Sequence, residues 1–418
     1  MRVSQFTRFV TIDKNISILY NALSRRYITL LPESKKSVLE FLEEINKGKY
    51  TRREIDIFSE MVRKRIIVSD AEEEIETLRK LEYDASHQEH KFQMVIYTTN
   101  KCNFRCIYCT QNHVGKTFEE QTIEQIMKFI EKKTEEVQEM ELNWFGGEPL
   151  LQYEDIVRIL SRVNPMCERN NCACTSNIVT NGFLLNEKKI KNLHKLHVKQ
   201  MQITVDGNRE THDKQRILIN GQGTYDVILK NICMAIEEGI QITLRINIGE
   251  KIALDVLDEI PVQYRENVVV SIANIFQNKS KISTYEMAKQ AIQKGYRYQG
   301  RYNTYAQCIA NKKNSLYIDA NGSILLCSNT CTDEKPIGRL QSDGQVEYSN
   351  LEKRNVQQRV SILQNAKCKG CVELPLCVGR CKYGVTKNDK CEGKRADGLT
   401  FEERARLDYY QDKYKKGE

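Results

Sequence analysis

Residues 92–109 read FQMVIYTTNKCNFRCIYC, an apolar strand-like run followed by a loop with three cysteines. Cys102, Cys106 and Cys109 are separated by three and then two residues. Three thiolates can hold three irons of a four-iron cluster and leave the fourth iron open to a ligand that is not protein. A structural zinc site needs four ligands, and His113 is the nearest candidate for the fourth, so zinc remains an alternative.

Outward from this stretch, residues 92–300 alternate short apolar runs with amphipathic helical patterns. The runs are FQMVIYTT, MELNWF, SNIVT, MQITVD, ITLRINI and VVVSIA. Such alternation predicts βα units around a parallel sheet. Six strands predict an α/β fold with a partial (β/α)6 TIM-like barrel, in which the chemistry lies at the carboxyl ends of the strands.

The flanks of this region differ from it. Residues 1–80 combine short strand-like runs with two helical patterns, which predicts a winged-helix-like module. Residues 81–91 are polar and charged and are interpreted as a linker. Residues 301–400 are rich in cysteine and loops, so bound metal would have to help hold them together. Residues 401–418 are expected to form a C-terminal helix.

Composition excludes several classes of protein. No apolar run approaches the ~18 residues of a membrane span, and the first residues lack the apolar core of a signal peptide, which predicts a cytoplasmic protein with no membrane partner. The net charge of +8 is spread along the chain and names no partner. Fifteen cysteines, an odd number with tight spacings, indicate metal or cluster binding in a reducing compartment rather than disulfides.

A second motif, WFGGEP at residues 144–149, follows the second predicted strand. Paired glycines let the backbone approach a ligand closely, and the Glu148 carboxylate could accept hydrogen bonds from an ammonium group. An ordinary βα turn is the alternative, because Gly-Gly turns are common.

Together the two motifs resemble those of the radical S-adenosylmethionine (SAM) superfamily, which has a CxxxCxxC loop and a GGEP motif in this order. The resemblance implies that the three cysteines hold a cluster whose open iron is chelated by SAM. It also implies that SAM is cleaved to methionine and a 5′-deoxyadenosyl radical. It places Tyr108 near the adenine, and Gly146, Gly147 and Glu148 at the methionine amino group.

Later strand ends offer weaker matches. In relatives, the residue two before an Asp-Gly pair and a following arginine meet the SAM carboxylate, which points to Thr204 and Arg216. Arg245 in the fifth strand is a further candidate. An arginine can grip a carboxylate with two parallel hydrogen bonds, but structural ion pairs are an equal alternative for both arginines.

The C-terminal cysteines form a GX4C motif and a CX2CX5CX3C run. Their order resembles a SPASM domain, which carries two auxiliary four-iron clusters. A structural zinc site is the alternative, since zinc ribbons also use CX2C pairs. By the resemblance, one cluster is held by Cys368, Cys371, Cys377 and Cys391, and the other by Cys308, Cys327 and Cys381. The second set is one ligand short, so either Cys331 completes it or an iron stays open to substrate thiolate or water.

A further group, CX4CXC at Cys167, Cys172 and Cys174, precedes the third strand and therefore falls at the opposite end of the barrel. It is interpreted as local structure, because no fourth ligand is evident.

The N-terminal module resembles the domain that precedes many SPASM peptide maturases and binds the leader of a precursor peptide, which can add a strand to a sheet edge. The resulting hypothesis is a radical SAM peptide maturase that abstracts hydrogen from a ribosomally made precursor and forms a thioether or carbon-carbon crosslink. Its cofactors would be three [4Fe-4S] clusters and SAM. Its partners would be the precursor and an electron donor of flavodoxin or ferredoxin type, with no nucleic acid. No catalytic acid or base is singled out by spacing.

Two alternatives are kept. An anaerobic sulfatase-maturating enzyme shares the radical and SPASM domains, but its proposed catalytic aspartate follows the cysteine of the GX4C motif, where this chain has Ser328. A winged-helix DNA-binding regulator with cysteine-bound metal fits the mild basic excess but does not account for the GGEP motif.

Overall fold

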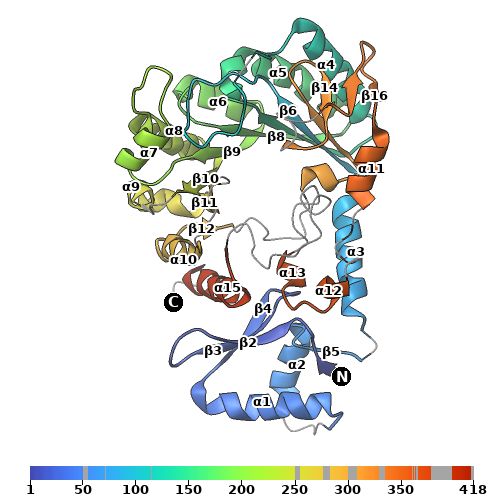
Figure 1. The fold of residues 1–418 in the computed structure, drawn as a ribbon, viewed down its shortest axis with the longest axis vertical. Coiled ribbons are helices and arrows are strands. Elements are labelled where there is room, and N and C mark those ends of the chain that lie inside the picture. Colours follow the sequence, from blue (N-terminus) through green and yellow to red (C-terminus); the bar gives the residue numbers. More distant parts are fainter. Residues whose placement is uncertain are drawn as a thin grey trace.

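The structure is a computed structural model, and Figure 1 shows its fold. It describes residues 1–49, 55–70, 72–113, 115–249, 255–275, 283–299, 308–328, 335–359, 361, 363, 366–377 and 398–415. Within these ranges, no helix is long and apolar enough to cross a membrane.

The central feature is an eleven-stranded sheet. Its parallel part runs in chain order through β6 (Lys91–Tyr97), β7 (Glu139–Phe145), β8 (Ala173–Thr180), β9 (Val198–Thr204), β10 (Gln241–Ile248), β11 (Val268–Asn274) and β12 (Arg297–Tyr298). The connecting segments form α4 (Glu120–Thr134), η2 (Pro149–Gln152), α5 (Tyr153–Arg169), α6 (Glu187–Lys195), α7 (Arg209–Gln215), α8 (Tyr225–Glu237), α9 (Val256–Glu259), η3 (Val262–Asn267) and α10 (Tyr285–Gln293). The prediction of an α/β fold with a parallel sheet is confirmed, and the six predicted strands are β6 to β11.

The sheet extends beyond the six predicted strands on both sides. β12 adds a short seventh parallel strand, and β13 (Ser315–Ile318) pairs in parallel with the other edge of β6. Antiparallel strands β14 (Ser323–Leu325), β15 (Gly338–Leu340) and β16 (Val346–Tyr348) follow. Part of the region predicted to be loop-rich therefore belongs to the central sheet. Strands of two to four residues carry too little periodicity to be recognised in a sequence.

The two faces of the parallel strands differ in polarity. Along β6, Met94 and Ile96 point to one face of the sheet, and Gln93 and Val95 point to the other. Met94 and Ile96 pack into the main core together with residues of the helices, such as Ile126. Figure 1 shows the strands following an arc, with α4, α5 and α6 on its outer side. The opposite face of the sheet is therefore the inner one, and it carries many of the polar side chains.

The N-terminal module contains a three-stranded antiparallel sheet of β2 (Thr7–Thr11), β3 (Ser17–Asn21) and β4 (Arg26–Leu30). Helices α1 (Pro32–Asn46) and α2 (Ile55–Arg63) cover one side of it, and β1 (Arg2–Val3) pairs with β5 (Ile67–Val68). These elements are strands plus two helices, as expected. Their classification as a winged helix stays a prediction.

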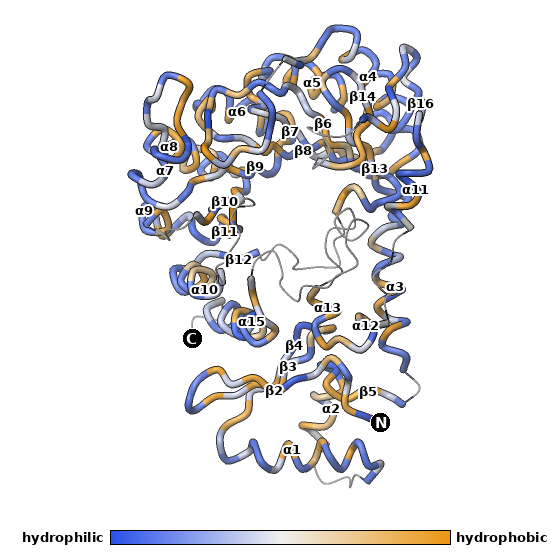
Figure 2. Tube along the Cα trace, in the orientation of Figure 1, coloured by the Kyte–Doolittle hydropathy of each residue, from blue (hydrophilic) through white to orange (hydrophobic). Residues whose placement is uncertain are grey.

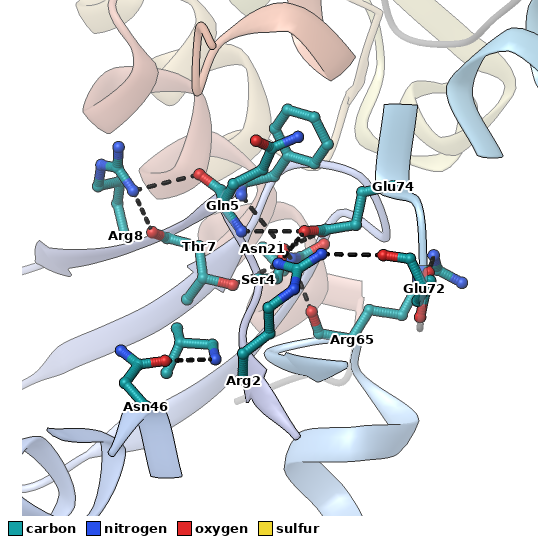
Figure 3. A network of polar contacts seen from close by, with 12 residues as sticks. Arg2, Ser4, Gln5, Thr7, Arg8, Asn21, Asn46, Arg65, Glu72 and Glu74 are labelled. Carbon is teal, nitrogen blue, oxygen red and sulfur yellow. Dashed lines mark hydrogen bonds and ion pairs between the residues drawn. The ribbon is translucent and has the colours of Figure 1, made fainter. Parts of the chain in front are cut away.

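Most of the segment between the module and the sheet is helical. α3 (Glu74–Ser86) covers the first six residues of the predicted linker 81–91. Figure 3 shows how its first residue is anchored: the buried Glu74 carboxylate accepts hydrogen bonds from Ser4 Oγ and Gln5 N (3.1 Å) and pairs with Arg2 Nη1 at 2.8 Å. These partners lie about seventy positions earlier in the chain, so the local sequence pattern does not predict the helix.

The module also contacts the C-terminal part of the chain. α15 (Phe401–Lys415) packs on α10 and on β2, and its Asp408 pairs with Arg25 and accepts a hydrogen bond from Tyr20 OH at 2.6 Å. One apolar cluster joins Phe6 and Tyr20 to Leu374 and Phe401. The remaining elements near this junction are η4 (Ile309–Asn311), α11 (Leu351–Arg359), α12 (Ala366–Lys369) and α13 (Leu374–Cys377).

Candidate functional site

The three cysteines lie together on the loop that follows β6. Cys102 and Cys106 are half-buried, and Cys109 is exposed. The loop is fixed by pairing with the segment after α7, where Phe104 forms a β-bridge with Leu218. This is the carboxyl end of the parallel strands, as predicted from the sequence.

The chemistry of these thiols fits a metal cluster. Phe104 N donates a hydrogen bond to Cys102 Sγ at 3.3 Å, and Asn181 Nδ2 lies 3.9 Å from the same sulfur. Burial raises the pKa of Cys102 to about 12 and also raises the pKa of Cys106, and the neighbouring thiols add to both shifts. Without a cation these thiols stay protonated at neutral pH, whereas a coordinated thiol is deprotonated outright. Hydrogen bonds to sulfur are also what cluster ligands receive in proteins.

Single-ion sites are a separate question. Across the described ranges, no group of three or more His, Cys, Asp or Glu side chains is placed to hold a metal ion. The assignment of three irons to the cysteine loop therefore rests on the spacing and chemistry of its thiols.

The GGEP turn packs directly on the base of the cysteine loop. Gly147 N donates to Thr99 O and Glu148 N donates to Lys101 O, both at 2.9 Å. A Cβ on Gly147 would lie 2.3 Å from the Lys101 carbonyl oxygen, and a Cβ on Gly146 would lie 2.4 Å from that of Thr99. Only glycine permits this approach at the two positions, so the pair fixes the two strand ends against each other.

Glu148 ties this turn to the end of β8. Its fully buried carboxylate accepts hydrogen bonds from Thr180 Oγ1 (2.7 Å), Asn181 N (2.8 Å) and Leu150 N (3.0 Å). Burial raises the pKa of Glu148, and these donors oppose the rise by stabilising the carboxylate. Both oxygens thus have partners inside the protein.

Tyr108, Asp206 and Arg216 form a buried polar group beside the cysteines, which we call the site triad. The Tyr108 hydroxyl donates to Asp206 Oδ2 and accepts from Arg216 Nη1 at 2.7 Å. Arg216 Nη1 lies 4.0 Å from Asp206 Oδ2, and its Nε is buried without a hydrogen-bond partner. The guanidinium therefore keeps an unused donor, which a bound carboxylate could satisfy.

Thr204 is the last residue of β9, and its partner in register is Arg245 within β10. Arg245 Nε donates to Asn247 Oδ1 at 3.0 Å, and its Nη1 donates to Ser271 Oγ at 3.3 Å. Asn247 in turn donates from its backbone to Asp206 Oδ1 at 2.8 Å. The predicted SAM-contacting residues are thus brought to the same strand ends as the cysteine loop.

Comparison with known proteins identifies this region. Residues 96–260 match the family described as the Radical SAM superfamily. They form a radical SAM domain. The chain is similar to the radical SAM cyclopropyl synthase TigE of Paramaledivibacter caminithermalis, with 27% identity over 201 residues that cover 42% of this chain and 42% of TigE. The chain thus spans less than half the length of this curated relative.

Two solved structures share the fold over more of the chain. Streptococcus suis SuiB bound to precursor peptide SuiA has a TM-score of 0.53 and 17% identity, covering 93% of this chain and 97% of SuiB. Native anSMEcpe with bound AdoMet and Cp18Cys peptide has a TM-score of 0.55 and 16% identity, covering 78% of this chain and 97% of anSMEcpe. At such identities the likeness is one of fold.

Beyond the radical SAM domain, two of the predicted auxiliary ligands lie beside one tyrosine. Tyr317 of β13 hydrogen-bonds Cys308 and neighbours Cys327, and burial raises the pKa of Tyr317. Cys327 is buried in a small apolar cluster with Tyr97 at the end of β6. Cys331 and Cys381, the other candidates for this cluster, lie outside the described residues.

The second predicted set follows α11. Cys371 N donates to Cys368 O at 3.0 Å, and Cys377 closes α13 with a bond from its backbone N to Glu373 O at 2.7 Å. Cys368 packs against the apolar cluster shared with the N-terminal module. Cys391 lies outside the described residues, so the ligand assignment stays a prediction.

The CX4CXC group is a packed cluster of thiols at the amino end of β8. Cys167 and Cys172 are buried, and Cys172 N donates to Cys167 O at 2.9 Å. A hydrogen bond with Cys174 raises the pKa of Cys167, and burial raises the pKa of Cys172 to about 12.

Three polar residues that organise the radical SAM domain lie in strand-end motifs of the sequence, but sequence reasoning assigned them no role. Asp206 and Asn247 bind the Tyr108 hydroxyl, and Asn181 links Glu148 to Cys102. Their positions after strands β8 and β9 and near the end of β10 were the available signal. The spacing of these residues does not predict their hydrogen-bond partners.

Proposed function

We propose that this protein is a radical SAM peptide maturase. It would cleave SAM to a 5′-deoxyadenosyl radical, abstract hydrogen from a ribosomally synthesised precursor peptide and form a thioether or carbon-carbon crosslink. The observation that carries the proposal is the cysteine loop at the carboxyl end of β6, beside an arginine with an unused buried donor. The cofactor supplies the radical, and the chain supplies binding and orientation.

Cys102, Cys106 and Cys109 would hold the SAM-binding [4Fe-4S] cluster. The Arg216 guanidinium would receive the SAM carboxylate through the donor that has no partner now. Thr204 and Arg245 would line the same strand ends. Tyr108 would be held by its hydrogen bonds with Asp206 and Arg216 in the site triad. Because Glu148 already accepts three internal hydrogen bonds, contact with the methionine amino group falls to the backbone of the Gly146–Gly147 turn.

The N-terminal module supports a peptide substrate. The likeness to SuiB spans 93% of the chain, so it must include part of residues 1–80. The likeness to anSMEcpe spans 78% of the chain. Among the described strands, β2 and β4 each pair only with β3, so each leaves an edge to which an extended leader could add a strand. We propose that the leader of the precursor binds there.

Two auxiliary clusters complete the proposal. Cys308 and Cys327, close to Tyr317, would belong to one of them, and Cys368, Cys371 and Cys377 to the other. Cys381, Cys391 and Cys331 are the remaining proposed ligands. These clusters would take up the electron released when the crosslink forms.

The experiment begins with metal analysis after anaerobic reconstitution. About twelve irons and as many sulfides per chain are expected for three clusters. Zinc without iron would contradict the radical chemistry. The loaded protein is then incubated with SAM, reductant and precursor peptides encoded nearby, and a peptide mass loss of about two hydrogens is expected. Formylglycine in a leaderless cysteine or serine peptide would instead identify a sulfatase-maturating enzyme.

A further inference from the structure

The CX4CXC group lies where α5 ends and β8 begins, at the end of the sheet opposite the cysteine loop. Cys167 continues the buried stripe of α5 that includes Ile159 and Val163. Figure 1 places α5 on the outer side of the sheet, and Figure 2 shows hydrophobic and hydrophilic stretches alternating in this part of the chain. Core packing accounts for an apolar side chain at Cys167, but it does not require two further cysteines beside it.

The backbone holds Cys167 against the start of β8. Cys172 N donates a hydrogen bond to Cys167 O at 2.9 Å. Asn171 has a positive φ of 52°, and its N donates to Glu168 O at 3.3 Å. This is the Schellman arrangement of a helix C-terminus, in which the residue after the left-handed position contacts the residue five positions earlier. The two cysteines occupy these two positions.

Cys172 and Cys174 both face α5. They flank Ala173, which is exposed, and Cys172 belongs to the main core while Cys174 packs against it. Successive side chains of an extended chain point to opposite faces, so residues two apart share a face. The two sulfurs are therefore presented to the same helix end, where Cys167 hydrogen-bonds both of them.

The hydrogen bonds among the three thiols run in one direction, from Cys172 to Cys167 and from Cys167 to Cys174. Donation to Cys174 raises the pKa of Cys167, and burial together with donation to Cys167 raises the pKa of Cys172 to about 12. Cys174 ends the series as an acceptor and is the least buried of the three. A thiolate is stabilised by the hydrogen bonds it accepts, and thiolates attack disulfides whereas buried protonated thiols are inert. Cys174 is thus placed to react first.

We propose that Cys174 and Cys167 form a redox-active dithiol that is oxidised by a small disulfide of the glutathione class. Cys174 attacks one sulfur of that disulfide, forms a mixed disulfide and releases one small thiol. Cys167 then attacks the Cys174 sulfur, which closes the disulfide between them and releases the second small thiol. The two protein thiols lose two electrons and two protons, and the small disulfide takes them up as it becomes two thiols.

The test uses the full-length chain after anaerobic reconstitution. The protein is equilibrated in buffers of fixed glutathione ratio, free thiols are alkylated, and the chain is cut with trypsin. Cleavage after Arg169 leaves Cys167 on residues 163–169 and the other two thiols on residues 170–188. We expect these peptides to be joined, about two hydrogens lighter than their sum, in a fraction that rises with oxidised glutathione. Absence of the joined peptides at every ratio would overturn the proposal.

This result is separate from the proposed function. The joined peptides contain none of the cysteines assigned to clusters, so the disulfide forms whether or not the chain takes up iron. A protein that lacks iron but forms the disulfide would refute the radical chemistry and support the dithiol. A protein with three clusters and no disulfide would do the reverse.

Variants separate the roles of the three sulfurs. Cys167→Ser should stop at the mixed disulfide, with glutathione left on Cys174, and Cys174→Ser should lower the joined fraction at least about tenfold. Cys172→Ser should keep the bond between Cys167 and Cys174. Cys233→Ser, at a half-buried cysteine of α8, is the matched control and should behave as the unchanged protein. A bond from Cys167 to Cys172, or zinc that shields all three thiols from alkylation, would contradict the proposal.

Discussion

Two groups of one tyrosine, one aspartate and one arginine occur in different parts of the chain. The site triad beside the cysteine loop contains Tyr108, Asp206 and Arg216. A second group, the docking triad, joins the N-terminal module to α15 and contains Tyr20, Asp408 and Arg25. In both, the tyrosine hydroxyl donates to the aspartate, yet the arginines are used differently.

The docking triad is saturated. Arg25 grips Asp408 with two nitrogens, one of them Nε at 3.0 Å from Oδ2, although its side chain is 31% exposed. Arg216 in the site triad is only 8% exposed, comes no nearer to Asp206 than 4.0 Å, and leaves Nε without a partner. A buried unsatisfied donor costs about 1–3 kcal/mol. The saturated group therefore holds the structure together, whereas the unsaturated one keeps a donor that, in our proposal, a bound ligand would use.

The largest effect is expected from breaking the docking triad. Asp408→Ala leaves Arg25 without its carboxylate and should destabilise the docked module by about 3 kcal/mol. Hydrogen exchange should show this as protection in β3 lowered on the order of 100-fold, with SAM affinity unchanged. Glu402→Ala, an exposed site on the same helix, is the control. Undiminished protection in Asp408→Ala would mean that the apolar cluster alone docks the module.

The site triad should respond through binding instead. Arg216→Gln removes the charged donor and should weaken SAM binding by about 2 kcal/mol, roughly 30-fold. Equilibrium dialysis on the cluster-loaded protein measures this change. Arg25→Gln is the matched change in the other triad and should leave SAM affinity as it is. Equal affinities in all three proteins would remove Arg216 from the SAM site.

Acid should weaken the site triad, because His212 supports it. The ring of His212 accepts from Asp206 N at 3.2 Å, and burial lowers its pKa to about 3. Between the unfolded pKa near 6.5 and this value, the unfolded chain binds a proton that the folded chain does not, so stability falls as pH falls. From pH 7 to pH 5.5 the loss is about 1 kcal/mol.

Unfolding in urea, followed by fluorescence of the single tryptophan, Trp144, measures this loss at each pH. His212→Asn should lack this component of the pH dependence. The same dependence in both proteins would show that other groups cause it.

The smallest effects come from the two hydroxyls. Tyr108→Phe and Tyr20→Phe each delete one hydrogen-bonding oxygen, for about 1 kcal/mol or roughly fivefold. The first change should weaken SAM binding, and the second should lower hydrogen-exchange protection of β3. A crossed result, with Tyr20→Phe impairing SAM binding, would contradict the separation of roles.

The fold was predictable where patterns are local. Alternating apolar runs revealed β6 to β11 because each of those strands is long enough to show its period. The helix α3 was not predicted, because Glu74 at its start is held by Ser4 and Gln5, which are distant in sequence. The strand β13 was not predicted, because it has four residues and pairs with a strand more than two hundred positions earlier.

In the candidate site, too, local features were predictable from the sequence and long-range contacts were not. The spacing of Cys102, Cys106 and Cys109 is local and identified the loop at once. The partnership of Tyr108 with Asp206 spans 98 positions and depends on how two strand ends converge. Sequence therefore indicates which residues carry chemistry more readily than which of their hydrogen bonds are already used.

The docking of Tyr20 on Asp408 also sets an order of assembly. These residues are 388 positions apart, so the N-terminal module leaves the ribosome long before α15 exists. At about 5–20 residues per second, the wait is roughly 20–80 s. During that time the apolar surface around Phe6 and Tyr20 has no α15 to cover it. The N-terminal module must therefore wait for α15 before it can dock, and a truncation that removes α15 would leave its apolar surface exposed to aggregation.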